Sequence, residues 1–261
     1  MRVSLSFTPQ LLFEDNHLLV VEKPTNLLSQ ADHSGSPDLL SLLKDWIKQR
    51  DQKPGQVFLG LVQRLDRPVG GVMVFAKTSK AASRLADQAR QRTLQKTYLA
   101  VVAGVVDPPE GTLTDWLQKD HHSNTVRVVE SGVPPAKQAI LHYERTAVHA
   151  NKSLLRIQLE TGRSHQIRVQ LAHCGYPLLG DHKYGQARKL SGPALWSHQL
   201  QFQHPTLRET LHFTSPPPQT KPWQDFELVY RILSGHQYVG LFPRIIGVVR
   251  SRMTPLSLAY P

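Results

Sequence analysis

The sequence predicts an α+β fold, in which strands outnumber helices and pair mainly in an antiparallel manner. Two observations carry this prediction. Short β-rich runs, such as residues 18–21, 72–75 and 155–159, are separated by turn-forming residues. Segments with helical periodicity occur at only a few places. The sequence therefore lacks the regular alternation of strand and helix that a doubly wound parallel sheet requires.

The first predicted strand covers residues 18–21 and ends at residues 24–26. Ser36, Pro37 and Asp38 then supply an N-cap, a proline for the first turn and an acidic residue at a helix start. We expect a helix that buries one stripe. The residues that repeat with helical period are Leu39, Leu40, Leu42, Leu43, Trp46 and Ile47.

Further along the chain, Pro68 and Gly70-Gly71 predict a turn, followed by a strand over 72–75 that is covered on both faces. Residues 155–159 alternate between apolar and polar, as a half-buried strand should. A turn at 161–163 leads into a helix from about residue 164 to 173. A second amphipathic helix is marked by Ala81, Ala82, Leu85, Ala86 and Ala89.

One acidic residue, Asp66, lies between Arg64 and Arg67 immediately before the covered strand. Nearby positive charge favours the ionised carboxylate, so we expect Asp66 to be charged at neutral pH. The predicted turn would present it beside a rigid sheet. Taken alone, the pattern is more often that of an ion-pair cluster on the surface.

Two other segments give this acid a context. Residues 96–104 form a β-rich run with a lone tyrosine, Tyr98, which by itself is typical of a core aromatic. Residues 159–173 contain Thr161-Gly162-Arg163 and place Arg168 about one turn inside the predicted helix. They are followed by residues 175–181 and by Tyr184-Gly185.

In this order and spacing, the three motifs resemble the RluA family of RNA pseudouridine synthases, over about residues 10 to 227. The resemblance implies a mixed, largely antiparallel sheet, bent into two halves and flanked by helices, with the active-site cleft between the halves. It also implies an isomerase that needs no cofactor. Its substrate would be specific uridines in transfer or ribosomal RNA.

The family's reaction breaks the uridine N1–C1′ bond, turns the flipped-out base, and rejoins it through C5. By resemblance, Asp66 is the nucleophile or base, Tyr98 is the group near C5 for the final proton removal, and Arg168 pairs with Asp66. Which atom Asp66 attacks stays open. Arg64 matches the residue that fills the space left by the flipped uridine. The other residues expected to bind substrate or shape the cleft are Arg67, Arg163, His165 and Gln166.

Two departures from the family pattern spare these residues. Gln63 stands where the family usually has histidine, and Val69-Gly70-Gly71 replaces Thr-Ser-Gly. We therefore expect activity, with a possible change of substrate fit. The chain also starts almost directly at the catalytic domain, without the S4 module of some relatives. Substrate choice is then expected to depend on the catalytic domain itself.

The composition favours the same kind of partner. Lysine and arginine number 31 against 20 acidic residues, a net charge of +11 that suits a phosphate backbone. No run approaches the ~18 apolar residues of a membrane span, and no signal peptide is evident. We expect a cytoplasmic monomer. The single Cys174 allows no internal disulfide and is expected in the core, and the 13 histidines lack the spacing of a metal site.

We expect residues 1–233 to form the catalytic domain. Residues 234–261 would be a basic tail, either disordered or touching RNA. Two other functions stay open at this point. One is an inactive relative that binds or folds RNA. The other is a hydrolase such as a glycosidase, which needs a second positioned acid. Asp181 is the nearby candidate, but its position after Gly180 is more typical of a structural turn.

Overall fold

The computed structural model describes residues 7–185, 190–227 and 229. Within this part, the strands are β1 (Gln10–Glu14), β2 (Leu18–Lys23), β3 (Gly60–Leu61), β4 (Gly70–Ala76), β5 (Gln95–Ala103), β6 (Glu110–Asp120), β7 (Thr125–Val129), β8 (Lys137–His149), β9 (Lys152–Leu159), β10 (Leu195–Gln203) and β11 (Thr210–Thr214). The helices are α1 (Leu39–Arg50), α2 (Ser79–Arg90), α3 (Gln166–His173) and the 3-10 helix η1 (Trp223–Phe226).

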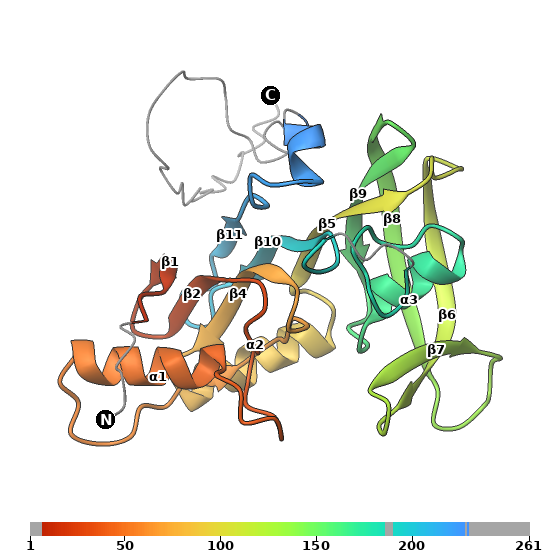
Figure 1. Ribbon diagram of the computed structural model, residues 1–261. Coiled ribbons are helices and arrows are strands. Elements are labelled where there is room, and N and C mark those ends of the chain that lie inside the picture. Colours follow the sequence, from red (N-terminus) through yellow and green to blue (C-terminus); the bar gives the residue numbers. More distant parts are fainter. Residues whose placement is uncertain (1–6, 186–189, 228, 230–261) are drawn as a thin grey trace, which may run out of the picture.

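All described strands join one sheet, in the order β1-β2-β4-β10-β5-β9-β8-β6-β7, with β11 on β10 and β3 on β4. Every pairing is antiparallel except that of β4 with β10. The α+β prediction is confirmed. Figure 1 shows α1 and α2 beside the half that contains β1, β2 and β4, and α3 against the half that contains β6 to β9.

The parallel pairing depends on two glycines at the start of β4. Gly70 and Gly71 lie opposite Trp196 and Ser197 of β10. A Cβ atom at Gly70 would overlap the Trp196 ring, and one at Gly71 would overlap the carbonyl oxygen of Ser197. Gly71 also has φ +117°, a conformation that side chains disfavour. The sequence predicted these glycines in a turn, but they begin the strand and let β10 approach.

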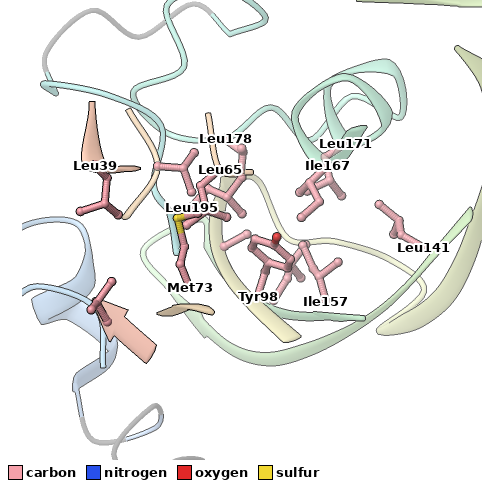
Figure 2. Close-up of a cluster of buried hydrophobic side chains, with 14 of the residues drawn as sticks. Leu39, Leu65, Met73, Tyr98, Leu141, Ile157, Ile167, Leu171, Leu178 and Leu195 are labelled. Carbon is pink, nitrogen blue, oxygen red and sulfur yellow. The ribbon is translucent and has the colours of Figure 1, made fainter. Parts of the chain in front are cut away.

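The core covers both faces of β4, as predicted. Met73 and Phe75 point to one face and pack in a cluster with the apolar side of α1, which contributes Leu39, Leu43 and Ile47. Val72, Val74 and Ala76 point to the other face and pack in a second cluster with Ala81 and Leu85 of α2. The first cluster continues under the other half of the sheet, where it includes Tyr98, Ile157 and Ile167 (Figure 2). This first cluster, which we call the core floor, therefore packs under both halves of the sheet.

Two local predictions need correction. The cap of α1 is Asp38, whose side chain accepts a hydrogen bond from the Ser41 amide, so the helix starts two residues later than a cap at Ser36 implies. Cys174 follows the last residue of α3 and is exposed rather than in the core. The prediction that Cys174 is buried was wrong because α3 ends at His173, so Cys174 does not continue the buried face of the helix.

The predicted tail, residues 234–261, lies outside the described residues, so the proposed boundary at 233 stays a prediction. No helix in the described ranges is long and apolar enough to cross a membrane.

Candidate active site

Asp66 lies on the loop between β3 and β4, and hydrogen bonds with other segments and within the loop hold this loop in place. The Ser29 hydroxyl donates to the Leu65 carbonyl at 2.7 Å and accepts from the Leu65 amide at 3.0 Å. The Lys23 ammonium donates to the Arg67 carbonyl at 3.1 Å. The Val69 amide closes a turn onto the Asp66 carbonyl at 2.9 Å. These bonds fix the backbone on both sides of Asp66, so its side chain has a defined direction.

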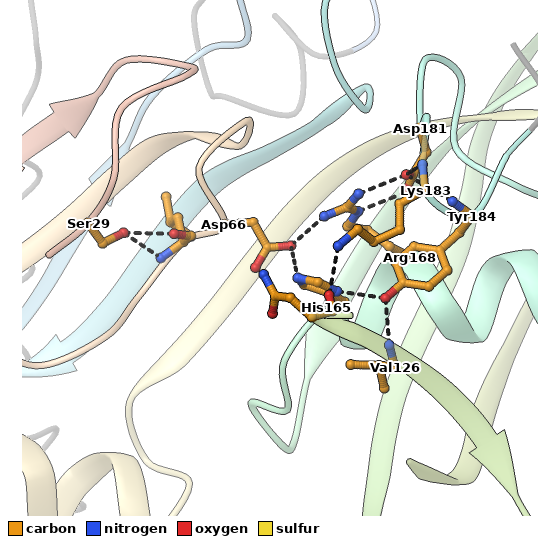
Figure 3. A network of polar contacts seen from close by, with 10 residues as sticks. Ser29, Asp66, Val126, His165, Arg168, Asp181, Lys183 and Tyr184 are labelled. Carbon is orange, nitrogen blue, oxygen red and sulfur yellow. Dashed lines mark hydrogen bonds and ion pairs between the residues drawn. The ribbon is translucent and has the colours of Figure 1, made fainter. Parts of the chain in front are cut away.

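The Asp66 carboxylate is paired with Arg168 of α3. Arg168 Nη1 donates to Asp66 Oδ2 at 2.9 Å, which confirms that these two predicted residues meet (Figure 3). The same guanidinium donates through Nε and Nη2 to both oxygens of Asp181, each at 2.8 Å. Asp181 also accepts from the backbone amides of Lys183 and Tyr184. Arg168 is thus clamped by one carboxylate and presented to another.

The two carboxylates differ in exposure. The side chain of Asp181 is 0 % exposed, whereas that of Asp66 is 26 % exposed. Burial opposes ionisation of Asp181, but the hydrogen bonds and charge of Arg168 outweigh it, so the pKa of Asp181 is lowered. Asp181 is therefore a buried counter-ion, more than the turn residue predicted from sequence. Asp66 is the carboxylate that a substrate can reach.

Arg64 and Arg67 do not act as the partners of Asp66 that their positions suggested. Both are exposed, and Arg67 Nε donates to the Asn26 carbonyl at 3.4 Å. Within the described residues, the ion pairs of Asp66 are with Arg168 and, at 3.8 Å, with His165. The two arginines that flank Asp66 in sequence are thus left at the surface.

His165 lies beside Asp66 in a left-handed conformation, with φ 52°. Its Nδ1 is 2.6 Å from the Tyr184 hydroxyl oxygen, which accepts a hydrogen bond from the Val126 amide at 2.9 Å. The phenol hydrogen is then free to be donated to Nδ1, and we assign the ring hydrogen to Nε2, which faces Asp66. Burial lowers the pKa of His165, although the charge of Asp66 opposes this, so the ring is neutral at pH 7.

Tyr98 of β5 is 7 % exposed and forms part of the core floor, as Figure 2 shows. Burial, together with the charge of Asp66, raises its pKa, against the effect of a hydrogen bond with Ser197. Ser197 in turn donates to the Val72 carbonyl at 3.0 Å. Tyr98 is therefore a neutral phenol that lies within the electrostatic reach of Asp66.

The remaining predicted residues lie in the loop before α3 and at the first position of that helix. Gln166 is buried, and its amide bonds to the Thr161 hydroxyl, the Arg163 amide and the Ile140 carbonyl at 2.8, 3.0 and 3.0 Å. Arg163 is exposed and its Nε donates to the Gln138 carbonyl at 2.9 Å. Gln166 therefore supports the loop through contacts inside the protein, while the Arg163 side chain stays at the surface.

Lys23 is a residue of the site that the sequence reasoning missed. It is 0 % exposed, and burial lowers its pKa to about 7, partly opposed by the charge of Asp66. A signal was present, because a lysine that ends the apolar strand β2 has no obvious solvated face. Ser29 and Tyr184 were also not assigned roles, and their hydrogen bonds cross between segments far apart in sequence.

Among the side chains that the structure describes, no group of three or more histidine, cysteine, aspartate or glutamate residues is arranged to hold an ion. The site thus consists of an open carboxylate, its clamped guanidinium, a neutral histidine and a buried phenol.

The chain matches known proteins over most of its length. Residues 17–173 match the family model described as RNA pseudouridylate synthase. The chain is 35% identical over 211 residues to the uncharacterized RNA pseudouridine synthase YhcT of Bacillus subtilis, covering 80% of this chain and 68% of that protein. It is 36% identical over 229 residues to ribosomal large subunit pseudouridine synthase D of Nitrosomonas europaea, covering 80% of this chain and 62% of that protein.

Among solved structures, the chain is similar to human RNA pseudouridylate synthase domain containing 4, with a TM-score of 0.66 and 25% identity. The match covers 80% of this chain and 88% of that one. The resemblance found in the three motifs is thereby confirmed across most of the fold. This chain belongs to the RNA pseudouridylate synthase family.

Proposed function

We propose that this protein isomerises uridine to pseudouridine in RNA, with Asp66 as the reacting carboxylate. The observation that carries the proposal is the pairing of the partly open Asp66 with Arg168, which Asp181 holds from behind. A charge-assisted pair of this kind keeps a carboxylate ionised and oriented where water is scarce. An ionised, oriented carboxylate is what cleavage of the N-glycosidic bond requires.

In this proposal the atoms balance within one nucleotide. The N1–C1′ bond breaks with Asp66 acting at the sugar or the base, the detached uracil turns, and C5 bonds to C1′. The proton on C5 is then lost and N1 gains one. Because the product is an isomer of the substrate, the reaction consumes no cofactor. Arg168 stabilises the negative charge of Asp66 before the first step and after the last.

Tyr98 is proposed as the side chain against which the uracil lies. Its ring belongs to the core floor, and its hydroxyl forms a hydrogen bond with the Ser197 side chain. Its raised pKa keeps the phenol protonated at neutral pH, so it cannot accept the C5 proton as a resident phenolate. Tyr98 would therefore orient the base and exclude water near C5. This refines the role that resemblance assigned to it.

The exposed Arg64 and Arg67 flank Asp66 and are proposed to contact RNA where the uridine leaves its stack. Unstacking costs a few kcal/mol, and a side chain that fills the vacancy offsets part of it. Two arginines at the mouth of the site also supply charge for the neighbouring phosphates. Large-subunit ribosomal RNA is the first substrate to test, because relatives such as that of Nitrosomonas europaea are named for it. Transfer RNA is the second.

The test is release of tritium from transcripts labelled with [5-³H]uridine, because formation of pseudouridine removes the hydrogen on C5. We expect the protein to release tritium from one of the two RNA classes. Pseudouridine mapping of the product would then locate the uridine. RNA that is bound without tritium release in either class would instead indicate an inactive RNA-binding relative.

The matched variant is Asp66→Asn, which is nearly isosteric and can serve neither as nucleophile nor as base. We expect it to bind RNA as the unchanged protein does and to release no tritium. Normal turnover by this variant would remove Asp66 from the proposed role. It would leave membership of the family intact, because that rests on the comparisons.

A further inference from the structure

A second cation, Lys96, lies on the same strand as Tyr98. The two residues are two positions apart on β5, so their side chains leave the same face of the sheet, about 6.6 Å apart along the strand. That face carries Tyr98, Ala100 and Val102 into the core floor below Asp66. Lys96 is therefore at the edge of the site, two residues before Tyr98, against which the uracil is proposed to lie.

The Lys96 ammonium has no partner within the described part of the chain. None of the described residues forms a hydrogen bond or ion pair with its side chain, which is partly buried. A cation on the segment just before β5 is paired, Arg92 with Glu160 at 2.6 Å. Burial lowers the pKa of Lys96 and no charged neighbour offsets this. A cation withdrawn from water without a partner is unfavourable, and a bound anion would relieve it.

The approach to this ammonium is kept open by a glycine. A Cβ atom at Gly162 would lie 3.6 Å from Lys96 Nζ, so any longer side chain there would cover the charge. Gly162 is exposed and belongs to the loop that leads to His165 and Arg168. The unpaired charge thus lies next to the loop that leads to His165 and Arg168, at a position where the sequence supplies no side chain.

We propose that Lys96 binds a phosphate of the RNA that flanks the uridine seated at Asp66 and Tyr98. This rests on the proposed function, since it takes RNA as the ligand. A compact ammonium is suited to a phosphate oxygen as a point charge. A contact this close to the flipped nucleotide would hold its backbone while the base is detached and turned.

The first experiment uses the unaltered protein. Lysines are acylated with an N-hydroxysuccinimide ester and identified by mass spectrometry, with and without a transcript of large-subunit ribosomal RNA. We expect RNA to protect Lys96, while Lys48, exposed on the last turn of α1, stays reactive. Equal labelling of Lys96 with and without bound RNA would overturn the proposal.

The second experiment compares Lys96→Met, Lys96→Arg and the control Lys48→Met. Loss of one phosphate contact should make the slope of log K against log salt shallower by about 0.7 to 0.9. We expect this change in Lys96→Met, recovery in Lys96→Arg, and the unaltered slope in Lys48→Met. If Lys96→Met keeps the full slope and affinity, Lys96 does not contact phosphate.

These outcomes separate the two proposals. Protection of Lys96 and a shallower slope, without tritium release by the unaltered protein, would support the phosphate contact and reject the isomerase. Tritium release with neither protection nor a change in slope would do the reverse. Each proposal therefore has a result of its own.

Discussion

Arg168 is shared by two carboxylates that have different tasks. Asp181 takes Nε and Nη2 in a two-point contact, and only Nη1 reaches Asp66. A planar guanidinium held at two points cannot turn without breaking both bonds. The position of the charge next to Asp66 is therefore set by Asp181, which lies 13 residues after Arg168 in the chain. Among the described contacts, Asp181 itself forms no hydrogen bond with Asp66.

The first prediction concerns Arg168→Ala. Without the guanidinium, the Asp66 carboxylate loses the partner that orients it and balances its charge in a partly buried site. We expect the single-turnover rate to fall by orders of magnitude. A generic phosphate contact would behave differently, because it would weaken binding and leave the rate at saturating enzyme nearly unchanged. A near-normal single-turnover rate would contradict the pairing.

The second prediction concerns Asp181→Asn. Breaking a buried pair from one side typically costs about 3 to 5 kcal/mol of stability. Because the folded-state pKa of Asp181 is lowered, its contribution is complete above the unfolded pKa of about 3.9 and is lost as the pH falls through the folded value. The difference in urea unfolding between variant and parent should be full at pH 7 and shrink below pH ~4.

The matched control is Asp87→Asn, which removes an exposed partner of Arg90 and should change stability by less than about 1 kcal/mol. A purely structural Asp181 would leave the reaction intact wherever the variant is folded. Under conditions in which Asp181→Asn is folded, we expect it to show a slower single-turnover rate and an unchanged RNA affinity. An unchanged rate in folded Asp181→Asn would show that Arg168 does not depend on it for position.

At the scale of elements, the junction of β4 and β10 brings the site together. The parallel pairing sets Ser197 beside Tyr98, its antiparallel partner on β5, and Gly71 on its other side. The strand that follows Asp66 is thereby joined to the strand that carries Tyr98 through a single intervening strand. Any side chain at Gly71 would disturb both.

The third prediction compares Gly71→Ala with Gly175→Ala. Both glycines have positive φ, at +117° and +84°, but a Cβ at Gly71 would overlap the Ser197 backbone, whereas nothing lies within 4 Å of one at Gly175. For Gly175→Ala we expect only the left-handed penalty, about 1 to 2 kcal/mol. For Gly71→Ala we expect a larger loss, measured by urea unfolding. Equal losses would mean that the close approach of β10 does not require glycine.

The elements that sequence predicted are those that local patterns determine. The apolar run after Asp66, the period of α1 and the alternation of β9 depend on neighbours along the chain, and all three were found. The parallel contact of β4 with β10 joins residues more than 120 positions apart, and no local pattern reports it. The turn assigned to Gly70-Gly71 was wrong for that reason.

The candidate site shows the same division. Asp66, Tyr98 and Arg168 were identified because each lies in a motif, and the structure brings them to one place. Sequence could not show that Arg64 and Arg67 are exposed beside Asp66, because direction depends on the fold. The burial of Lys23 and the clamp by Asp181 also depend on contacts between distant segments. The pair of Asp66 with Arg168 could thus be predicted from the motifs, whereas the other contacts of these residues required the structure.

At the scale of the whole molecule, the site is assembled from both halves of the sheet. Asp66 comes from the connection between β3 and β4, and Arg168 comes from α3, which lies against the half with β6 to β9 (Figure 1). The exposed arginines proposed to contact RNA come from both halves in the same way. Arg64 and Arg67 lie in one half, and Arg163 lies in the other.

The fourth prediction concerns the net charge of +11, which should govern docking. Each phosphate that a lysine or arginine neutralises releases counter-ions, so log K falls linearly with log salt, with a slope of about −0.7 to −0.9 per contact. If docking uses about six contacts, affinity should fall by roughly 10³ between 50 and 200 mM salt.

The measurement is best made with Asp66→Asn, in which binding is separated from turnover. Because adding salt screens every exposed pair, its effect on folding must be followed in parallel by circular dichroism. An affinity that stays flat across this range while the fold is intact would show that the basic surface is not where RNA docks, and the specificity of the enzyme would then have to come from contacts within the site alone.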